Sequence, residues 1–278
     1  NAYRNKGDSG RAIADYTEAL RLDPNIAAAY NNRGLAYKNK GDYDRAIADF
    51  NQALRLDPNY AAAYNSRGNA YSDKGDNDRA IEDYNQALRL DPNYAMAYSN
   101  RGLAYSNKKD YDRAIADYNE ALRLDPNYAA AYSNRGIAYY NKKDYDRAIA
   151  DFNEALRLDP NYAAAYNNRG IAYKNKGDYD RAIADYTEAL RLDPNYAAAY
   201  YNRGNAYKDK KDYDRAIADY TEAIRLAPDA VRYNNRGAAY YYKKDYARAR
   251  TDWEKALQLD PNNADARNNL EVLRSMGY

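Results

Sequence analysis

The chain has 278 residues, and its 43 basic and 41 acidic side chains leave a formal net charge of only +2. This near-balance gives no reason to expect a polyanionic partner such as a nucleic acid. Cysteine and histidine are both absent, which excludes disulfides and removes the commonest residues of zinc and general-base chemistry. No run of 18 apolar residues occurs, so we expect a soluble chain that spans no membrane, with the cytoplasm favoured as its compartment.

From its first residues the chain is built of copies of one 34-residue unit. Prolines recur at residues 24, 58, 92, 126, 160, 194, 228 and 261, and the glycine of an Arg-Gly pair keeps the same register. Residues 1–26 are a partial repeat, and residues 264–278 are interpreted as a C-terminal capping helix. These units predict one domain over residues 1–278. Its full repeats are residues 27–60, 61–94, 95–128, 129–162, 163–196, 197–229 and 230–263.

Each repeat is predicted to form two helices. In the first full repeat, aromatic and small residues recur at i, i+4 and i+7 from Tyr30, which indicates a helix over residues 28–40. Asp42 is a suitable N-cap for a second helix, whose apolar stripe covers residues 43–54. Pro58 prevents continuation of that helix. Because a helix pair this short cannot bury its own apolar stripe, the repeats must stack on one another.

The small and aromatic residues of this unit resemble the signature of the tetratricopeptide repeat family. With Ala27 counted as position 1, the matching positions are 4, 8, 11, 20, 24, 27 and 32. They are occupied by Tyr30, Gly34, Tyr37, Ala46, Phe50, Ala53 and Pro58. The resemblance covers essentially the whole chain and implies an all-α, right-handed α-α superhelix, with first helices lining a concave channel. It also implies a protein–protein interaction scaffold that binds an extended peptide or a partner helix in that groove.

Every full repeat has arginine at position 7, where the family usually has leucine. These residues are Arg33, Arg67, Arg101, Arg135, Arg169, Arg203 and Arg236. Positions 4, 7, 8 and 11 lie within one arc of about 100°, so the arginine lies on the packed side of the helix or at its border. A partly buried guanidinium needs a carboxylate, and each of these repeats has aspartate at position 23. We therefore predict an ion pair in every repeat, such as Arg135 with Asp151; the alternative is a solvated arginine.

No catalytic, metal or cofactor site is predicted. The carboxylates recur in nearly every repeat, which favours helix capping and ion pairing over a metal site. An active site is usually unique, whereas this chain consists almost entirely of copies, so we expect no enzyme. The lysines at position 14 form a basic edge, but the aspartates at position 16 offset their charge. That argues against nucleic-acid binding.

Asparagine at position 6 gives the main candidate binding residues. They are Asn32, Asn100, Asn134, Asn168, Asn202 and Asn235, and Ser66 is the one break. Position 6 lies roughly 150° from the middle of the packed arc, which places these amides on the channel side. An amide can donate and accept, as a peptide backbone does, and the pattern resembles asparagine ladders that hold peptides in some family members. The alternatives are that each amide bonds a neighbouring repeat, or was simply copied by duplication.

Tyrosine, at 36 residues, is the unusual count in the composition, and most of these residues fall at regular repeat positions. Tyr201, Tyr241 and Tyr242 lie outside that pattern, and we predict an aromatic binding patch around them. Incidental surface tyrosines are the alternative.

Two other functions stay open: a structural, self-associating solenoid, and a consensus-like engineered array without an evolved ligand. The partial N-terminal repeat, with residues 11–22, is predicted to make end-to-end contacts.

Overall fold

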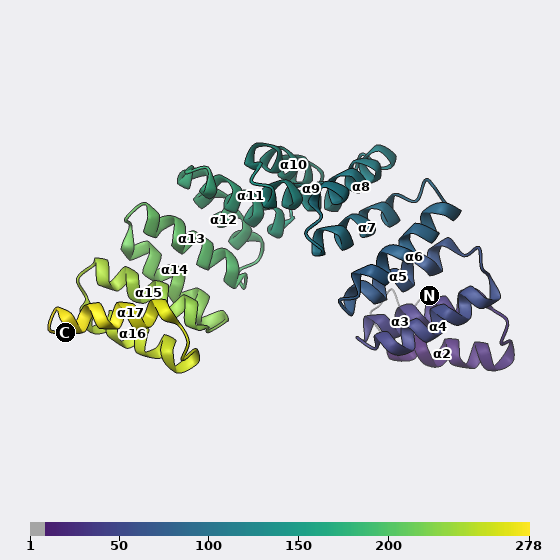
Figure 1. The fold of residues 1–278 in the computed structure, drawn as a ribbon, viewed down its shortest axis with the longest axis horizontal. Helices are drawn as coiled ribbons and strands as arrows, with labels where there is room; N and C mark the ends of the chain where they lie inside the picture. The colour runs from purple at the N-terminus through teal and green to yellow at the C-terminus, as the bar shows by residue number, and fades with distance from the viewer. Residues whose placement is uncertain (1–8) are drawn as a thin grey trace. The chain divides into compact units, whose positions relative to one another are not determined.

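The computed structural model describes residues 9–278, and within that range it has sixteen α-helices and no strand (Figure 1). It divides into two compact units, residues 1–142 and 143–278. The described part of the first unit holds α2 (Ser9–Leu22), α3 (Ala27–Asn39), α4 (Tyr43–Leu56), α5 (Ala61–Asp73), α6 (Asn77–Leu90), α7 (Ala95–Asn107), α8 (Tyr111–Leu124) and α9 (Ala129–Asn141). The second holds α10 (Tyr145–Leu158), α11 (Ala163–Asn175), α12 (Tyr179–Leu192), α13 (Ala197–Asp209), α14 (Tyr213–Leu226), α15 (Ala230–Tyr242), α16 (Tyr246–Leu259) and α17 (Ala264–Ser275). The single domain predicted over residues 1–278 stays a prediction.

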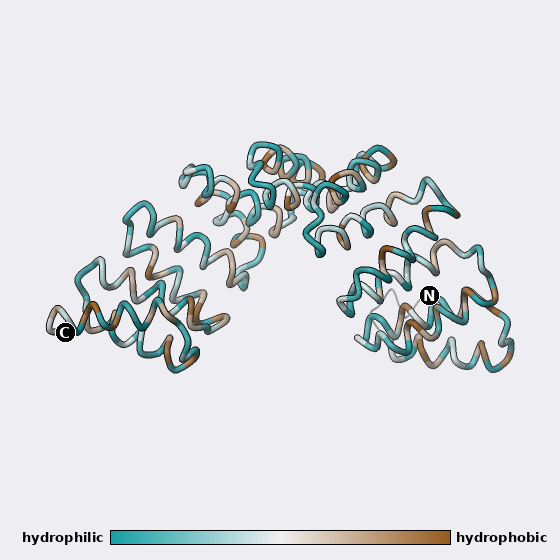
Figure 2. The backbone as a smooth tube through the Cα atoms, in the orientation of Figure 1, coloured by the Kyte–Doolittle hydropathy of each residue, from teal (hydrophilic) through white to brown (hydrophobic). Residues whose placement is uncertain are grey.

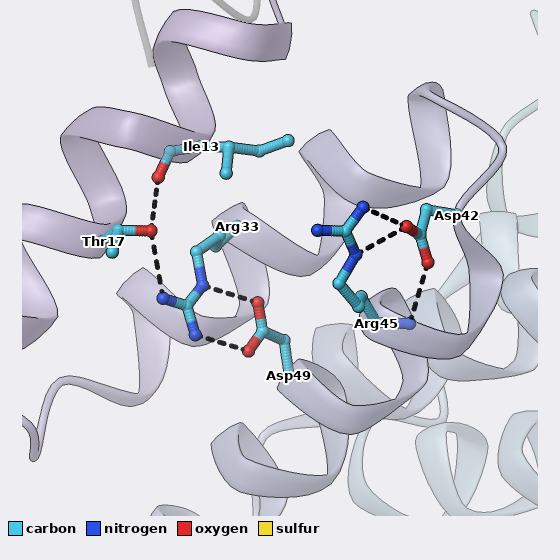
Figure 3. A network of polar contacts seen from close by, with 6 residues as sticks. All are labelled: Ile13, Thr17, Arg33, Asp42, Arg45 and Asp49. Carbon is cyan, nitrogen blue, oxygen red and sulfur yellow. Dashed lines mark hydrogen bonds and ion pairs between the residues drawn. The ribbon is translucent and has the colours of Figure 1, made fainter.

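The helices begin where the repeat predicts them. Asp42 is the N-cap of α4, and its Oδ1 accepts the backbone N–H of Arg45 at 3.2 Å. Its Oδ2 also accepts from Arg45 Nε at 2.5 Å (Figure 3), and the Arg45 guanidinium lies over the Tyr37 ring, 4.6 Å from the centroid. One aspartate thus caps the second helix and fixes an arginine across the end of the first helix.

The core is a series of small clusters, each shared by two repeats. Phe50 and Ala46 of α4 pack with Ala70 of α5, and all three are fully buried. Gly34 of α3 lets the Phe50 ring pack closely against that helix, because a Cβ at Gly34 would lie only 2.7 Å from Phe50 Cε1. In the second unit, Tyr186 forms the corresponding cluster. Since each cluster needs the following repeat, a single repeat cannot bury its own apolar residues, as the sequence predicts.

The second helices of the repeats are strongly amphipathic, most of the first helices are only weakly so, and the apolar residues do not gather into long runs. Figure 2 shows hydrophilic and hydrophobic segments alternating along the helices of both units. Over residues 9–278, no helix combines the length and apolar character that a membrane span requires.

The first helices of successive repeats approach one another closely in each unit. α3 contacts α5, α5 contacts α7 and α7 contacts α9; in the second unit α11, α13, α15 and α17 form the same kind of series. The second helices of successive repeats make no comparable contact in the described part of the chain. Helices that approach more closely lie on the inside of a bend, so the first helices form the inner face of each unit.

Candidate functional site

The arginine at position 7 pairs with the aspartate at position 23 of its own repeat. Figure 3 shows Arg33, whose Nε and Nη2 donate to the two carboxylate oxygens of Asp49, each at 2.7 Å. This carboxylate raises the pKa of Arg33, so the guanidinium stays charged. The same two-pronged geometry recurs in Arg67–Asp83, Arg101–Asp117, Arg169–Asp185, Arg203–Asp219 and Arg236–Asp252. The prediction is confirmed for these six repeats, and the pair of Arg135 with Asp151 stays a prediction.

The third guanidinium nitrogen reaches the preceding repeat, which the sequence did not predict. Arg101 Nη1 donates to Asn85 Oδ1 at 2.7 Å, and Arg33 Nη1 donates to Thr17 Oγ1 at 3.2 Å (Figure 3). The Arg101 guanidinium also lies 5.5 Å from the centroid of the Tyr98 ring. Each such arginine therefore ties its first helix to two second helices.

Positions 2, 6, 9 and 13 form one row along each first helix, because they are spaced i, i+4, i+7 and i+11. We call this row the inner stripe; it faces away from the second helices. The predicted asparagines lie on it: Asn32 on α3, Asn100 on α7, Asn134 on α9, Asn168 on α11, Asn202 on α13 and Asn235 on α15. All six are half-buried.

Several of these amides bond the preceding repeat, which was the alternative interpretation. Asn100 Nδ2 donates to Oδ1 of Asn65 at 3.0 Å. Equivalent bonds join Asn202 to Asn167 at 2.9 Å and Asn269 to Asn234 at 3.1 Å, and Asn235 donates to Tyr201 Oη at 2.7 Å. Each bond links position 6 to position 5 of the repeat before it. The stripe amides therefore hold the stack together, and only their remaining donors and acceptors are free for a ligand.

Position 5 is the functional position that the sequence analysis missed. Apart from Tyr201, its residues are buried, with relative exposures from 1% for Ser133 to 8% for Asn234. The signal was present in the sequence, because this position carries asparagine or serine in every full repeat except the one with Tyr201. A small polar residue kept at a packed position indicates a buried hydrogen bond.

Exposed apolar side chains accompany the amides on the inner stripe. On α7, Met96 is 50% exposed and Leu103 is 42% exposed, and on α9 Ile137 is 36% exposed. They are the large apolar residues exposed on the first helices in the described part of the first unit. In the second unit Val231 of α15 is 52% exposed. Apolar side chains clustered on one exposed face commonly mark an interaction surface.

Of the three predicted tyrosines, Tyr241 and Tyr242 contact each other, and the patch of all three stays a prediction. Tyr201 packs against Tyr220, with ring centroids 5.9 Å apart, and accepts the hydrogen bond from Asn235. Tyr241 and Tyr242 contact each other edge to face at 5.7 Å. Tyr242 lies at the end of α15 and is exposed, whereas Tyr201 is half-buried two turns earlier in the repeat. The structure thus brings Tyr241 and Tyr242 together and places Tyr201 in the position-5 row.

The carboxylates serve as caps and ion-pair partners. Over residues 9–278, no group of three or more His, Cys, Asp and Glu side chains could hold a metal ion. Burial raises the pKa of the Tyr118 hydroxyl, which therefore stays protonated at neutral pH.

Four tetratricopeptide repeat profiles match the sequence. The one described as "Tetratricopeptide repeat" matches residues 27–60, 163–196, 197–229 and 230–263, and the one described as "TPR repeat" matches residues 1–41 and 68–109. Two further profiles described as "Tetratricopeptide repeat" match residues 99–163 and 50–82. The chain belongs to the tetratricopeptide repeat (TPR) family. No curated protein sequence matches it.

Solved TPR structures share the fold. The Cut9–Hcn1 complex of the APC/C superposes with a TM-score of 0.73 at 22% identity, over 96% of this chain and 54% of that one. This chain thus spans about half the length of that neighbour. YrrB, described as a TPR protein with an unusual peptide-binding site, gives a TM-score of 0.54 at 27% identity, over 70% of this chain and 97% of that one. Pseudomonas aeruginosa PilF gives a TM-score of 0.66 at 23% identity, over 80% of this chain and 96% of that one. TPR proteins are generally non-enzymatic scaffolds for protein partners.

Proposed function

We propose that this TPR chain is a non-enzymatic scaffold that holds an extended peptide of a partner protein along the inner stripe of its first helices. The carrying observation is the composition of that stripe, in which half-buried amides alternate with exposed apolar side chains. On α7 the row reads Met96, Asn100, Leu103 and Asn107. Amides match the donors and acceptors of a peptide backbone, and apolar neighbours give contact area to its side chains.

The inter-repeat bonds support this assignment rather than compete with it. Asn100 uses one N–H for Asn65, and its second N–H and its Oδ1 stay available. The bond fixes the amide plane, so less side-chain entropy is lost when a ligand binds. The proposed ligand contacts are Asn32, Asn100, Asn134, Asn168, Asn202 and Asn235. Tyr201, Tyr241 and Tyr242 are proposed to add contacts in the second unit.

The test is a screen of an arrayed library of random 15-residue peptides, followed by titration of the best binder. Replacing Asn100, Asn134, Asn168 and Asn202 together by alanine should lower affinity by at least about tenfold, since several hydrogen bonds of about 1 kcal/mol each are lost.

A matched control separates binding from stability. Asn65→Ser with Asn167→Ser removes two inter-repeat bonds, yet keeps every stripe amide, and serine already stands at this position in Ser99 and Ser133. This control should bind the peptide within about twofold of wild type while it melts at a lower temperature. Equal binding by the quadruple variant and wild type would refute the proposed site.

A further inference from the structure

A ladder of ion pairs runs along the edge where the first helix of each repeat turns into the second. We call this the turn edge; it comprises positions 12–18. The lysine at position 14 pairs with the aspartate at position 18 of the preceding repeat. The pairs are Lys74–Asp44, Lys108–Asp78, Lys142–Asp112, Lys176–Asp146, Lys210–Asp180 and Lys243–Asp214. In addition, the aspartate at position 16 pairs with the arginine at position 19, as Asp212 does with Arg215.

A second row of pairs joins position 12 to position 13 of the next repeat. Lys38 pairs with Asp73, and Lys174 pairs with Asp209, both at 3.0 Å. Lys208 is the third lysine at position 12, but the residue at position 13 of the next repeat is Tyr242. Over residues 9–278, no carboxylate lies within ion-pair distance of Lys208. Of the three lysines at position 12, Lys208 is therefore the one that lacks this partner in the described part of the chain.

The last full repeat lacks a second acid of the ladder. Position 18 is aspartate in the six repeats before it and Ala247 here. Independently of that change, the lysines at position 15, Lys211 and Lys244, have no carboxylate within ion-pair distance in the described part of the chain, as is also the case for Lys109 and Lys143. The turn edge of α13 to α16 carries three ammonium groups without an ion-pair partner: Lys211 and Lys244 at position 15, and Lys208, whose counterparts Lys38 and Lys174 are paired.

Two of these lysines share a left-handed backbone conformation with Lys109 and Lys143 of earlier repeats. Lys211 and Lys244 have φ values of 63° and 64°, in the left-handed region that favours glycine, and Gly177 holds the same position with φ 82°. A non-glycine residue there costs on the order of 1 kcal/mol.

Exposed aromatic rings lie beside these charges. Tyr242 is 59% exposed, and its ring stacks on Tyr213 with centroids 5.3 Å apart and planes 14° from parallel. Tyr241 meets the Tyr242 ring edge to face. A shallow depression of about 400 Å³ between the two turns is lined by Lys211, Tyr213 and their neighbours. The surface therefore combines cations with the exposed ring of Tyr242, and the depression beside it is lined mainly by charged residues.

We propose that the turn edge of α13 to α16 binds an acidic peptide segment of a partner protein. Its carboxylates pair with Lys208, Lys211 and Lys244, and an aromatic or aliphatic side chain between them packs on Tyr242. A nucleic acid fits less well, because four carboxylates, those of Asp209, Asp212, Asp214 and Asp245, remain on this edge and would repel a continuous phosphate backbone. This surface does not depend on the asparagines of the inner stripe.

The test measures anisotropy of a fluorescein-labelled peptide of four Glu-Glu-Phe triplets in 50 mM salt. The variant Tyr242→Asp with Ala247→Asp restores the two acids that other repeats carry, so its fold is expected to persist. It should bind at least about tenfold more weakly, because both acids compete for the free lysines. Binding by wild type should also weaken as salt rises.

Asn175→Asp is the control, since it adds an acid at position 13 of the repeat before Asp209 and should leave affinity unchanged. The proposal is overturned if wild type does not bind the Glu-Glu-Phe peptide, or if the matched Gln-Gln-Phe peptide binds equally. It is also overturned if the double variant binds as wild type does, or if labelled oligothymidine binds more tightly than the acidic peptide. The quadruple asparagine variant should still bind the acidic peptide, which separates this surface from the proposed stripe.

Discussion

Asn100 donates from Nδ2 to Oδ1 of Asn65, 3.0 Å away, and so joins α7 to the first helix of the preceding repeat. The corresponding place between α3 and α5 pairs Asn31 with Ser66, whose side chain is shorter by an amide. Asn31 is 5% exposed, and its Oδ1 has no hydrogen-bond partner in the described part of the chain. The one break in the asparagine row therefore leaves a buried acceptor unsatisfied.

Ser66→Asn should stabilise the protein by about 1 kcal/mol, because the new amide can donate to Asn31 Oδ1. Urea unfolding followed by circular dichroism measures the change. In an Asn31→Ala background the same substitution should give no gain, since the acceptor is gone. Equal effects in the two backgrounds would contradict this account.

Loss of one partner from the Arg101–Asp117 pair should be strongly destabilising. Asp117 is 6% exposed and accepts two hydrogen bonds from Arg101, so Arg101→Leu leaves a buried carboxylate without its cation. The expected cost is about 3 kcal/mol, and Arg101→Leu with Asp117→Leu should recover a large part of it. A double-mutant cycle by chemical denaturation supplies the coupling energy. A coupling near zero would show that the pair is incidental.

The hydroxyl of the tyrosine at position 24 should contribute to the free energy of unfolding in one repeat and not in another. Tyr84 Oη donates to Asn69 Oδ1 at 2.7 Å, whereas Tyr118 Oη is buried without a hydrogen bond in the described residues. Tyr84→Phe should cost about 1 kcal/mol, and Tyr118→Phe should be neutral or stabilising. Phenylalanine already occupies this position as Phe50. Thermal melts of the two variants give the comparison, and a larger loss for Tyr118→Phe would contradict it.

The left-handed turn residue gives a reciprocal pair of substitutions. Lys109 has φ 62°, and Gly75 holds the equivalent position with φ 84°. Lys109→Gly should stabilise the protein by roughly 0.5–1 kcal/mol, and Gly75→Lys should destabilise it by a similar amount. A Cβ at Gly75 meets no atom within 4 Å, so the effect of that change comes from the backbone alone. The melting temperature should rise for Lys109→Gly and fall for Gly75→Lys, each relative to wild type.

Acid should remove the charge contribution of the helix caps. The bond with the Arg113 side chain lowers the pKa of Asp110, so this stabilisation is complete above the ordinary carboxyl pKa. It is lost as pH falls through the lowered, folded-state pKa. Asp110→Asn keeps a capping side chain but not the charge, so wild type should be more stable at pH 7, and the difference should vanish near pH 2. A difference that is constant with pH would count against the ion pair.

The helices, the caps and the arginine pairs could be predicted because each depends on spacing within one repeat. Asp42 lies three residues before the N–H that it caps, and Arg33 and Asp49 lie on two helices of fixed register. Contacts between repeats were harder to predict, because the sequence does not state how far one repeat is rotated on the next. Positions 5 and 6 differ by about 100° on the helix, so a modest rotation decides which amide is buried.

Two kinds of contact in this chain respond differently to shuffling of its repeats. The Asn69–Tyr84 bond lies within one repeat, so recombination that moves whole units carries both partners together. The Asn100–Asn65 bond spans a boundary, so its survival depends on which unit becomes the neighbour. Duplication or deletion of whole units therefore leaves contacts of the first kind intact. Contacts of the second kind form only when particular units are neighbours, so they depend on the order of the units. At the junction of Asn31 with Ser66 the two units do not match, and the Asn31 acceptor is left without a partner in the described part of the chain.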